Sequence, residues 1–460
     1  MTISAHNSLW WDTLPEDLKI ANRPTLAQDT ALDVVIVGAG FTGLWTAYYL
    51  KKKNPALLVA IIESQFAGFG ASGRNGGWCS ALFPTSIEKL AKIFGPEAAI
   101  AMQDAMHSTV TEVESVIQRE QIDCDWKRGG TVVLARTPLQ LARAKQEAAE
   151  WHSWGYGTDD YSYLDQGHVK DLVNATNSLG ATFTPHCAVI HPAKLVRALA
   201  KIVEGLGVTI YENTAATSIT PHLVQTKFGA VKAKFVVRAT EGFTSQLPKQ
   251  KRIVAPIYSL MIATEPLNES VWETIGLRNR ESFSDHRNLI IYGQRTADNR
   301  IAFGGRGAPY HFGSKIDPGF DQNQQVQNAL FEVLTEMFPV LSDAKVTHSW
   351  GGPLGVPRDW MASCGLDQTT GFAWAGGYVG DGVATSNLAG RTLADLITND
   401  SSNLVTLPWV NHKSPKWEPE PLRWIGANVG LRAMTWADKT EDKSGKTSRI
   451  ATITNKFLGN

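Results

Sequence analysis

The chain has 460 residues, of which 43% are hydrophobic and 19% charged, and its 44 basic side chains balance its 44 acidic ones. This length exceeds what one hydrophobic core usually holds, so we expect two domains of a globular protein. A formal net charge of zero lacks the basic surplus typical of nucleic-acid binding, which disfavours a tRNA-modifying function and favours small-molecule partners.

Cysteine and histidine spacing argues against disulfides and metal sites. The four cysteines lie far apart without a CxxC pair, and the eleven histidines show no metal-ligand spacing, so we expect no metal and structural roles for His186 and His191. The chain start lacks a signal-peptide pattern, and no apolar run reaches about 18 residues. These features predict a cytoplasmic protein without a transmembrane segment.

The elements expected in chain order begin with a polar surface arm over residues 1–31. A βαβ unit follows, with buried strands at 32–37 and 57–62 around a helix that Asn54-Pro55 ends. The later elements are helices at about 86–121, 139–153, 192–204 and 382–397, strands at 131–134, 208–212 and 234–240, and an antiparallel sheet within 251–310.

A glycine motif joins the first strand to its helix. Gly38-Ala39-Gly40-Phe41-Thr42-Gly43 is GxGxxG, in which Gly38 permits the tight turn, Gly40 lets backbone approach a pyrophosphate, and Gly43 allows close helix–strand packing. Glu63 ends the second strand, where its carboxylate can accept hydrogen bonds from ribose hydroxyls. Strand, helix and acid together predict dinucleotide binding.

Two further glycine-rich segments favour FAD over NAD. The loop 68–78 offers backbone N–H groups and the cation Arg74, and the turn 376–382 opens a helix whose N-terminus can stabilise negative charge on a reduced flavin. The candidate FAD-binding residues are Gly38, Gly40, Phe41, Thr42, Gly43, Glu63, Ser64, Ala71, Ser72, Gly73, Arg74, Asn75, Gly76, Gly77, Trp78, Ala216, Ala239, Thr240, Gly377, Gly380, Asp381, Gly382 and Val383.

The predicted fold class is α/β, with a Rossmann-type FAD-binding domain that an antiparallel-sheet substrate domain interrupts twice. We assign 32–90, 181–250 and 351–400 to the FAD-binding domain, and 91–180 and 251–350 to the substrate domain. Residues 401–460 are expected to form a linker, to about 418, and C-terminal helices. The amphipathic run 422–432 is expected to pack on the protein, with contact to a partner or a membrane surface as the alternative.

Four segments carry a resemblance to a known family. The GAGFTG turn, the ASGRNGG loop, the VVRATEG strand end and the AGGYVGDGVATSNLAGRTLADL segment resemble the D-amino acid oxidase superfamily of FAD-dependent oxidoreductases over about 32–400. Within this group, which includes sarcosine and glycine oxidases, SGRNGG is most similar to γ-glutamylputrescine oxidase-like proteins.

The resemblance implies oxidation of a C–N bond in an amine or amino acid. Hydride passes from the carbon beside the amine to flavin N5, the imine hydrolyses, and oxygen reoxidises the flavin with formation of peroxide. Two alternatives stay open: a dehydrogenase that passes electrons to a quinone or carrier, and a flavin-binding protein without turnover. The sequence leaves the amine and the oligomeric state undetermined.

This chain also departs from the family pattern. Sarcosine oxidases attach FAD through a cysteine shortly after the strand matching 349–354, whereas here the nearest thiol, Cys364, comes several residues late, so we expect non-covalent FAD. Those enzymes also carry a carboxylate-binding lysine where this chain has Ala384, which weakens the case for a simple N-methyl amino acid substrate.

Candidate catalytic residues come from a strand pair and the last glycine turn. Tyr292 and Arg306 lie on strands whose relatives face the flavin, and Arg306 would suit a carboxylate or another anion. Asp381 stands where the family more often has histidine. It could pair with a cationic amine or cap the following helix, and we favour the cap.

Overall fold

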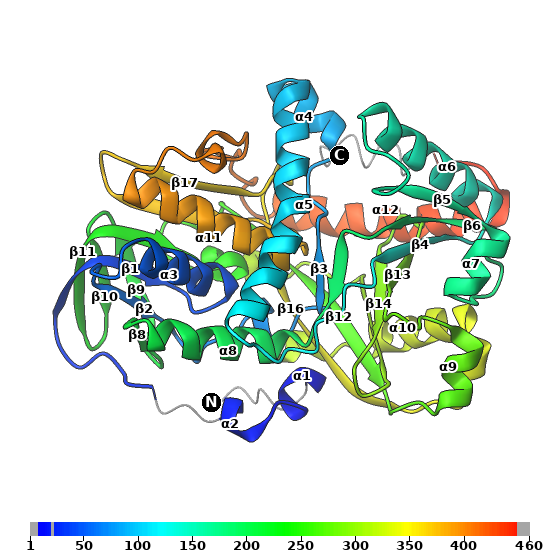
Figure 1. The fold of residues 1–460 in the computed structure, drawn as a ribbon, viewed down its shortest axis with the longest axis horizontal. Helices are drawn as coiled ribbons and strands as arrows, with labels where there is room; N and C mark the ends of the chain where they lie inside the picture. The colour runs from blue at the N-terminus through cyan, green and yellow to red at the C-terminus, as the bar shows by residue number, and fades with distance from the viewer. Residues whose placement is uncertain (1–7, 20–22, 449–460) are drawn as a thin grey trace.

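A computed structural model describes residues 8–19 and 23–448. Two eight-stranded sheets lie side by side, with the first sheet at the left and the second at the right of Figure 1. A two-stranded ribbon of β3 (Trp78–Ser80) and β7 (Cys187–Val189) accompanies them. The mixed α/β fold class predicted from the sequence is confirmed.

The first sheet contains the expected βαβ unit. Alternate residues of its central strand enter two cores, since Val34 and Ile36 face the helices while Val35 and Val37 pack on the opposite side. In spatial order its strands are β17 (Ser363–Asp367), β18 (Phe372–Gly376), β11 (Gly229–Arg238), β1 (Thr30–Val37), β2 (Val59–Ile62) and β8 (Thr209–Tyr211). β10 (Leu223–Thr226) also pairs with β11, and β9 (Ala216–Thr220) pairs with β10.

Helices cover one face of this sheet. α3 packs against both α11 and α8, and α5 packs against α11 in the same hydrophobic core. Their bounds, with that of the neighbouring α4, are α3 (Phe41–Lys53), α4 (Ile87–Phe94), α5 (Pro96–Arg119), α8 (Pro192–Gly205) and α11 (Gly382–Thr398).

The second sheet is mostly antiparallel and two-faced. Val132 and Leu134 enter a core with the helices behind the sheet, whereas Thr131 and Val133 face a cavity on its other side. Its strands in order are β16 (Val346–Val356), β12 (Ala255–Thr264), β15 (Ile301–Arg306), β14 (Ile291–Arg295), β13 (Ser282–Asp285), β4 (Thr131–Ala135), β6 (Gly180–Thr184) and β5 (Ser162–Asp165). The helices on this side are α6 (Pro138–Ser153), α7 (Gln166–Leu172), α9 (Glu269–Ile275) and α10 (Gln324–Met337).

Three segments differ from the expected division. Residues 91–180 were assigned to the substrate domain, but α5 packs in the core of the first sheet. β6 and β16 belong to the second sheet, although residues 181–184 and 351–356 were assigned to the FAD-binding domain.

The expected helix 86–121 is broken where Gly95 adopts φ 94° and Pro96 begins the next helix.

The chain ends are more firmly packed than the expected arm and linker. Two short helices, α1 (Leu9–Asp12) and α2 (Glu16–Lys19), precede β1, and Trp10 is buried against Trp350. In the expected linker 401–418, Trp409 and Trp417 are both buried. One helix, α12 (Leu422–Ser444), follows in the described part of the chain. Short 3-10 turns elsewhere are η3 (Phe312–Ser314), η4 (Pro318–Asp321), η5 (Pro339–Leu341) and η6 (Asn403–Thr406).

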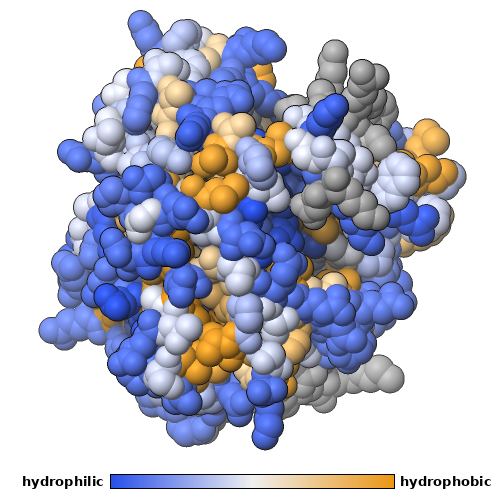
Figure 2. Space-filling model, turned by 90° about the vertical axis from the view of Figure 1, so that its right-hand side faces the viewer, coloured by the Kyte–Doolittle hydropathy of each residue, from blue (hydrophilic) through white to orange (hydrophobic). Residues whose placement is uncertain are grey.

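The outer surface on the side of the second sheet is mostly hydrophilic, with apolar side chains gathered near the middle of that face (Figure 2). Within residues 8–19 and 23–448, no helix combines the length and the hydropathy that a membrane crossing requires.

Candidate functional site

A groove of about 320 Å³ lies where β1, β2 and β11 of the first sheet end. Carboxyl ends of parallel strands are the usual place for a nucleotide in such sheets. The groove brings together most of the predicted FAD-binding residues: Gly38, Gly40, Phe41, Thr42, Glu63, Ser64, Ala71, Ser72, Asn75, Ala216, Ala239, Thr240, Gly380, Gly382 and Val383.

Glu63 organises the turns at one end of this groove. Its carboxylate accepts hydrogen bonds from the backbone N–H of Ala39 at 2.8 Å and of Gln65 at 2.9 Å, and from the Ser64 hydroxyl at 3.1 Å. Burial raises the pKa of this carboxyl, and these hydrogen bonds oppose the rise. The side chain therefore fixes the GxGxxG turn and lines the groove wall.

The N-terminus of α3 meets the second glycine loop inside the groove. Phe41 donates its backbone N–H to the Ser72 hydroxyl at 2.8 Å, and a Cβ on Gly40 would lie 2.8 Å from the same oxygen. Gly38 has φ 111°, and a Cβ there would lie 2.4 Å from the carbonyl oxygen of Ala239. Backbone thus approaches the groove closely at the place where helix N–H groups attract a pyrophosphate.

The remaining predicted FAD-binding residues do not line the groove. Close packing explains Gly43 and Gly77, whose added Cβ atoms would lie 2.0 Å and 2.5 Å from backbone oxygens, and Gly73 and Gly377 are similarly crowded. The other four, Arg74, Gly76, Trp78 and Asp381, line a second cavity.

Glu241 was missed by the sequence analysis. It begins the 3-10 turn η2 (Glu241–Gln246), lines the groove, and accepts the N–H groups of Gly377 at 2.7 Å and Gly355 at 3.2 Å. Burial raises its pKa to about 7, while these N–H groups and Arg238 oppose the rise. Glu241 is the glutamate of the VVRATEG segment, so that segment was the signal available in the sequence. Other unpredicted lining residues are Val37, Ile62, Phe69, Gly70, Ala215, Gly242, Phe243, Gln246, Leu247, Pro353, Leu354, Tyr378 and Ser386.

The second cavity has a volume of about 280 Å³ and uses one face of the second sheet as a wall. It contains all three predicted catalytic side chains, Tyr292, Arg306 and Asp381. Four residues line both this cavity and the groove: Ala71, Asn75, Leu354 and Gly380.

Tyr292 is held rigidly in the cavity wall. Its ring stacks on Trp78, with centroids 5.4 Å apart, and its hydroxyl shares a 2.8 Å hydrogen bond with Ser259, a cavity residue that the sequence analysis missed. Burial raises the pKa of Tyr292. The phenol is therefore a neutral, positioned hydrogen-bonding group.

Arg306 and Asp381 form the charged part of the wall. Arg306 donates to the carbonyl oxygen of Val379 at 2.9 Å and lies over the ring of Trp360, and burial lowers its pKa. Burial raises the pKa of Asp381 to about 7, although the charge of Arg306 opposes this. The favoured capping role is wrong, because the Asp381 side chain makes no cap hydrogen bond to α11. This leaves its carboxylate available to the cavity that it lines.

One group of potential metal ligands appears among the described residues, contrary to what histidine spacing indicated. His107, Asp160 and His186 bring ligand atoms within 4.8 Å of one another. His186 already contacts Asp160 at 2.8 Å, and the two imidazoles stack with centroids 3.8 Å apart. Stacking and hydrogen bonding account for the group, and His191 is a helix cap that accepts the N–H of Lys194.

Comparison with protein families identifies the chain. Residues 33–396 match the family described as FAD dependent oxidoreductase (DAO). The chain belongs to this family. FAD is the cofactor of DAO proteins, and the groove fits it. Glu63 can accept hydrogen bonds from a ribose, and the N-termini of α3 and α11 can stabilise negative charge. The glycine turns let the cofactor approach the backbone closely.

Curated DAO relatives cover most of the chain. It is 31% identical to "Gamma-glutamylputrescine oxidoreductase" of Escherichia coli over 389 residues, which are 83% of this chain and 87% of the relative. It is 24% identical to "Sarcosine oxidase subunit beta" of Arthrobacter sp, over 82% of this chain and 89% of the relative.

Solved structures share the DAO fold. Glycine oxidase from Geobacillus kaustophilus superposes with a TM-score of 0.69 at 20% identity, covering 83% of this chain and 99% of that one. L-proline dehydrogenase from P. horikoshii gives a TM-score of 0.68 at 19% identity, covering 83% and 96% of the two chains.

Proposed function

We propose that the protein oxidises the carbon–nitrogen bond of an amine or amino acid that binds in the second cavity. The observation that carries this proposal is the wall shared by the cavity and the FAD groove, to which Ala71, Asn75, Leu354 and Gly380 contribute. A substrate in the cavity can thus contact a cofactor in the groove. When bound, FAD supplies a two-electron acceptor for the hydride on the carbon beside the amine.

Asp381 is the residue that we assign to the amine itself. An amine must lose its proton before its carbon gives up hydride, and Asp381 offers a carboxylate in the cavity. An amine in water titrates far above an ordinary carboxyl group. Burial raises the pKa of Asp381 to about 7 and lowers that of a buried ammonium, so the two values approach each other.

Arg306 and Tyr292 serve as positioning groups in this proposal. The guanidinium of Arg306 limits the rise in the pKa of Asp381, and its bond to Val379 fixes it beside the last glycine turn. Tyr292 presents its hydroxyl together with Ser259 on the sheet face. Water then hydrolyses the imine to a carbonyl compound and releases its nitrogen as ammonia or an amine.

The names of the relatives support an amine substrate. "Gamma-glutamylputrescine oxidoreductase" and "Sarcosine oxidase subunit beta" both name compounds with an oxidisable C–N bond. We also propose non-covalent FAD, because the four buried cysteines of the described chain lie outside the walls of groove and cavity. The same free thiols support a cytoplasmic location.

Oxygen is the electron acceptor that we propose, with peroxide as its product. The test is to incubate the holoenzyme with amines and amino acids in air, and to measure peroxide and carbonyl products. Both products in equal amounts support an amine oxidase. Carbonyl product only with an added quinone analogue indicates a dehydrogenase, and no product with any acceptor overturns the amine assignment and leaves a flavin-binding protein.

A further inference from the structure

The second cavity extends away from the FAD groove to a group of side chains on α6 and its neighbours. α6 lies on the opposite side of the molecule from β1 and α3 (Figure 1). It contributes Glu147 and Trp151 to the cavity wall, and Tyr161 and His186 line the wall beside them. We call these four residues the distal site.

Glu147 is the acidic member of the distal site, and it is open to a ligand. Its side chain is 42% exposed, and the space that it faces is the interior of the cavity. The protein that surrounds this cavity removes water from the carboxylate and raises its pKa to about 7. Glu150 adds to this rise, and a hydrogen bond from Trp151 opposes it. In the described chain, its one ion-pair contact is with His286, at a long 3.6 Å.

His286 does not neutralise that carboxylate. Burial lowers the pKa of His286 to about 4, so the imidazole is uncharged near neutral pH. The Nε2 atom of His286 is buried and lacks a hydrogen-bond partner among the described residues. Above about pH 7, where the carboxyl group is ionised, Glu147 therefore carries a negative charge without a cationic partner among the described residues.

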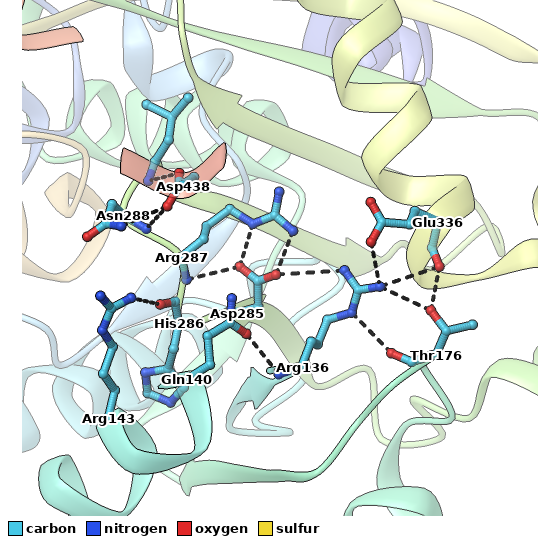
Figure 3. Close-up of polar contacts among 11 residues, drawn as sticks. Arg136, Gln140, Arg143, Thr176, Asp285, His286, Arg287, Asn288, Glu336 and Asp438 are labelled. Atoms are coloured by element: carbon cyan, nitrogen blue, oxygen red, sulfur yellow. Dashed lines mark hydrogen bonds and ion pairs between the residues drawn. The ribbon is translucent and has the colours of Figure 1, made fainter. Parts of the chain in front are cut away.

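The arginines nearby are committed to other groups, as Figure 3 shows. Arg287 binds Asp285 through two 2.6 Å hydrogen bonds, and Asp285 is fully buried. Arg136 bonds to Thr176 and Glu336, and Arg143 bonds to the carbonyl oxygen of His286. Arg143 also bonds to Glu441, which Figure 3 does not draw. The Asp285 carboxylate at the cavity wall is thus already paired, unlike that of Glu147.

Two aromatic side chains lie beside Glu147 in the cavity wall. The rings of Trp151 and Tyr161 stack in parallel, with centroids 4.1 Å apart, and both line the cavity with Glu147. Aromatic rings attract ammonium groups, and a carboxylate beside them adds charge and hydrogen bonding. A ligand carboxylate would meet like charge here instead.

We propose that the distal site binds a second ammonium group at the far end of the amine substrate. This inference rests on the proposed function and narrows its substrate class to α,ω-diamines and longer polyamines. Asp381 then holds the amine that is oxidised, and Glu147 holds the one that is not. The distance between the two ammonium groups sets which chain lengths fit.

Calorimetry on dithionite-reduced holoenzyme tests binding separately from oxidation, since the reduced enzyme cannot oxidise the ligand. The probes are α,ω-diamines of four to six carbons, monoamines of the same lengths, and ω-amino carboxylates. At about pH 8, where Glu147 is ionised, we expect the best diamine to bind at least about ten-fold more tightly than its monoamine, and the ω-amino carboxylates to bind more weakly than either.

The variant Glu147→Gln keeps the side-chain shape and removes the charge, so it should abolish the preference for diamines. Glu150→Gln is the matched control on an exposed position of the same helix and should keep it. Equal binding of diamines and monoamines, tightest binding of ω-amino carboxylates, or a preference that survives in Glu147→Gln would overturn the distal site. A preference for diamines without any oxidation of amines would instead overturn the proposed function and leave the distal site standing.

Discussion

The FAD groove presents mainly backbone to its ligand, whereas the substrate cavity presents side chains. In the groove, glycine turns allow close approach, and Glu63 and Glu241 act on backbone N–H groups of those turns. In the cavity, the ligand meets a sheet face with Tyr292, and charged groups such as Arg306 and Asp381. One region is specified by chain geometry and the other by side-chain chemistry.

This contrast explains how one fold can hold one cofactor and many substrates. Most groove residues follow the strand ends of β1, β2 and β11 in sequence, and the others come mainly from β16 and the last glycine turn. The cavity wall draws on distant elements, including α6, β4, β12, β14 and β15. A change of substrate therefore requires changes in side chains of the second sheet and α6, while the FAD groove can stay unchanged.

The broadest effect is expected from Gly38→Ala, because it acts on cofactor binding itself. The residue has φ 111°, and its new Cβ would lie 2.4 Å from the Ala239 carbonyl oxygen. Positive φ alone costs about 1–2 kcal/mol, and the overlap adds to that cost. We expect purified protein to retain less than about a tenth of the wild-type flavin, measured from absorbance. Gly205→Ala, where a Cβ meets open space, should keep its flavin, and full flavin in Gly38→Ala would show that the turn tolerates a side chain.

Asp381→Asn should slow flavin reduction and leave the flavin bound. Removal of a general base usually costs 10²- to 10⁴-fold, so we expect an anaerobic bleaching rate constant about 10³-fold lower. Because the carboxylate form is the active one and its pKa is about 7, the wild-type rate should rise as the pH increases through about 7 and level off above it. In the variant, the rate of flavin reduction should no longer rise with pH in this way. An unchanged profile would remove Asp381 from proton transfer.

Glu241→Gln should change how the stability of the FAD-free protein depends on pH. The folded-state pKa is about 7, above the value of 4.5 in an unfolded chain, so the folded state binds more protons and stability falls as pH rises between these values. The wild-type decrease attributable to Glu241 is about 3 kcal/mol. Urea unfolding at the two ends of this range should show a smaller decrease in the variant. Equal decreases would mean that Glu241 titrates normally.

Tyr292→Phe is expected to have the smallest effect. Its ring can still stack on Trp78, and the variant loses the hydroxyl that bonds to Ser259 and that can hydrogen-bond to a substrate in the cavity. A hydrogen bond of this kind contributes about 0.5–1.5 kcal/mol, which corresponds to a rise in KM of about two- to twelve-fold. Tyr310→Phe, whose hydroxyl bonds to Glu420 and Ser314 away from the cavity, is the control. A change of KM that is the same in both variants would place Tyr292 outside the substrate site.

Local spacing explains why the FAD groove could be predicted. Gly38, Gly40 and Glu63 follow strands within one βαβ unit, so their positions depend on short-range geometry. The segment assignments to two domains stay a prediction. The boundaries of these segments do not match the sheets at β6 and β16, which both belong to the second sheet. A strand pairs with the strand beside it in space, and sequence position alone does not specify that strand.

The cavity was harder to predict, for a physical reason. Glu147 and Tyr161 are brought together only when α6 and the loop before β5 pack on the second sheet. Asp381 was recognised, but its role depends on where the side chain points, and an N-terminal helix position favours the cap that the structure does not form. Burial, which changes the pKa of Asp381 and Glu241, is likewise a property of the assembled fold.

The most direct test of the shared site is the absorbance of the bound flavin when the oxidised holoenzyme is mixed with amines in the absence of oxygen. Amine in the cavity contacts the cofactor in the groove, so we predict complete bleaching by at least one amine or amino acid, at a rate that saturates with its concentration. A flavin that stays oxidised with every amine, α,ω-diamine and amino acid, while remaining fully bound, would contradict the assignment of the cavity as the substrate site.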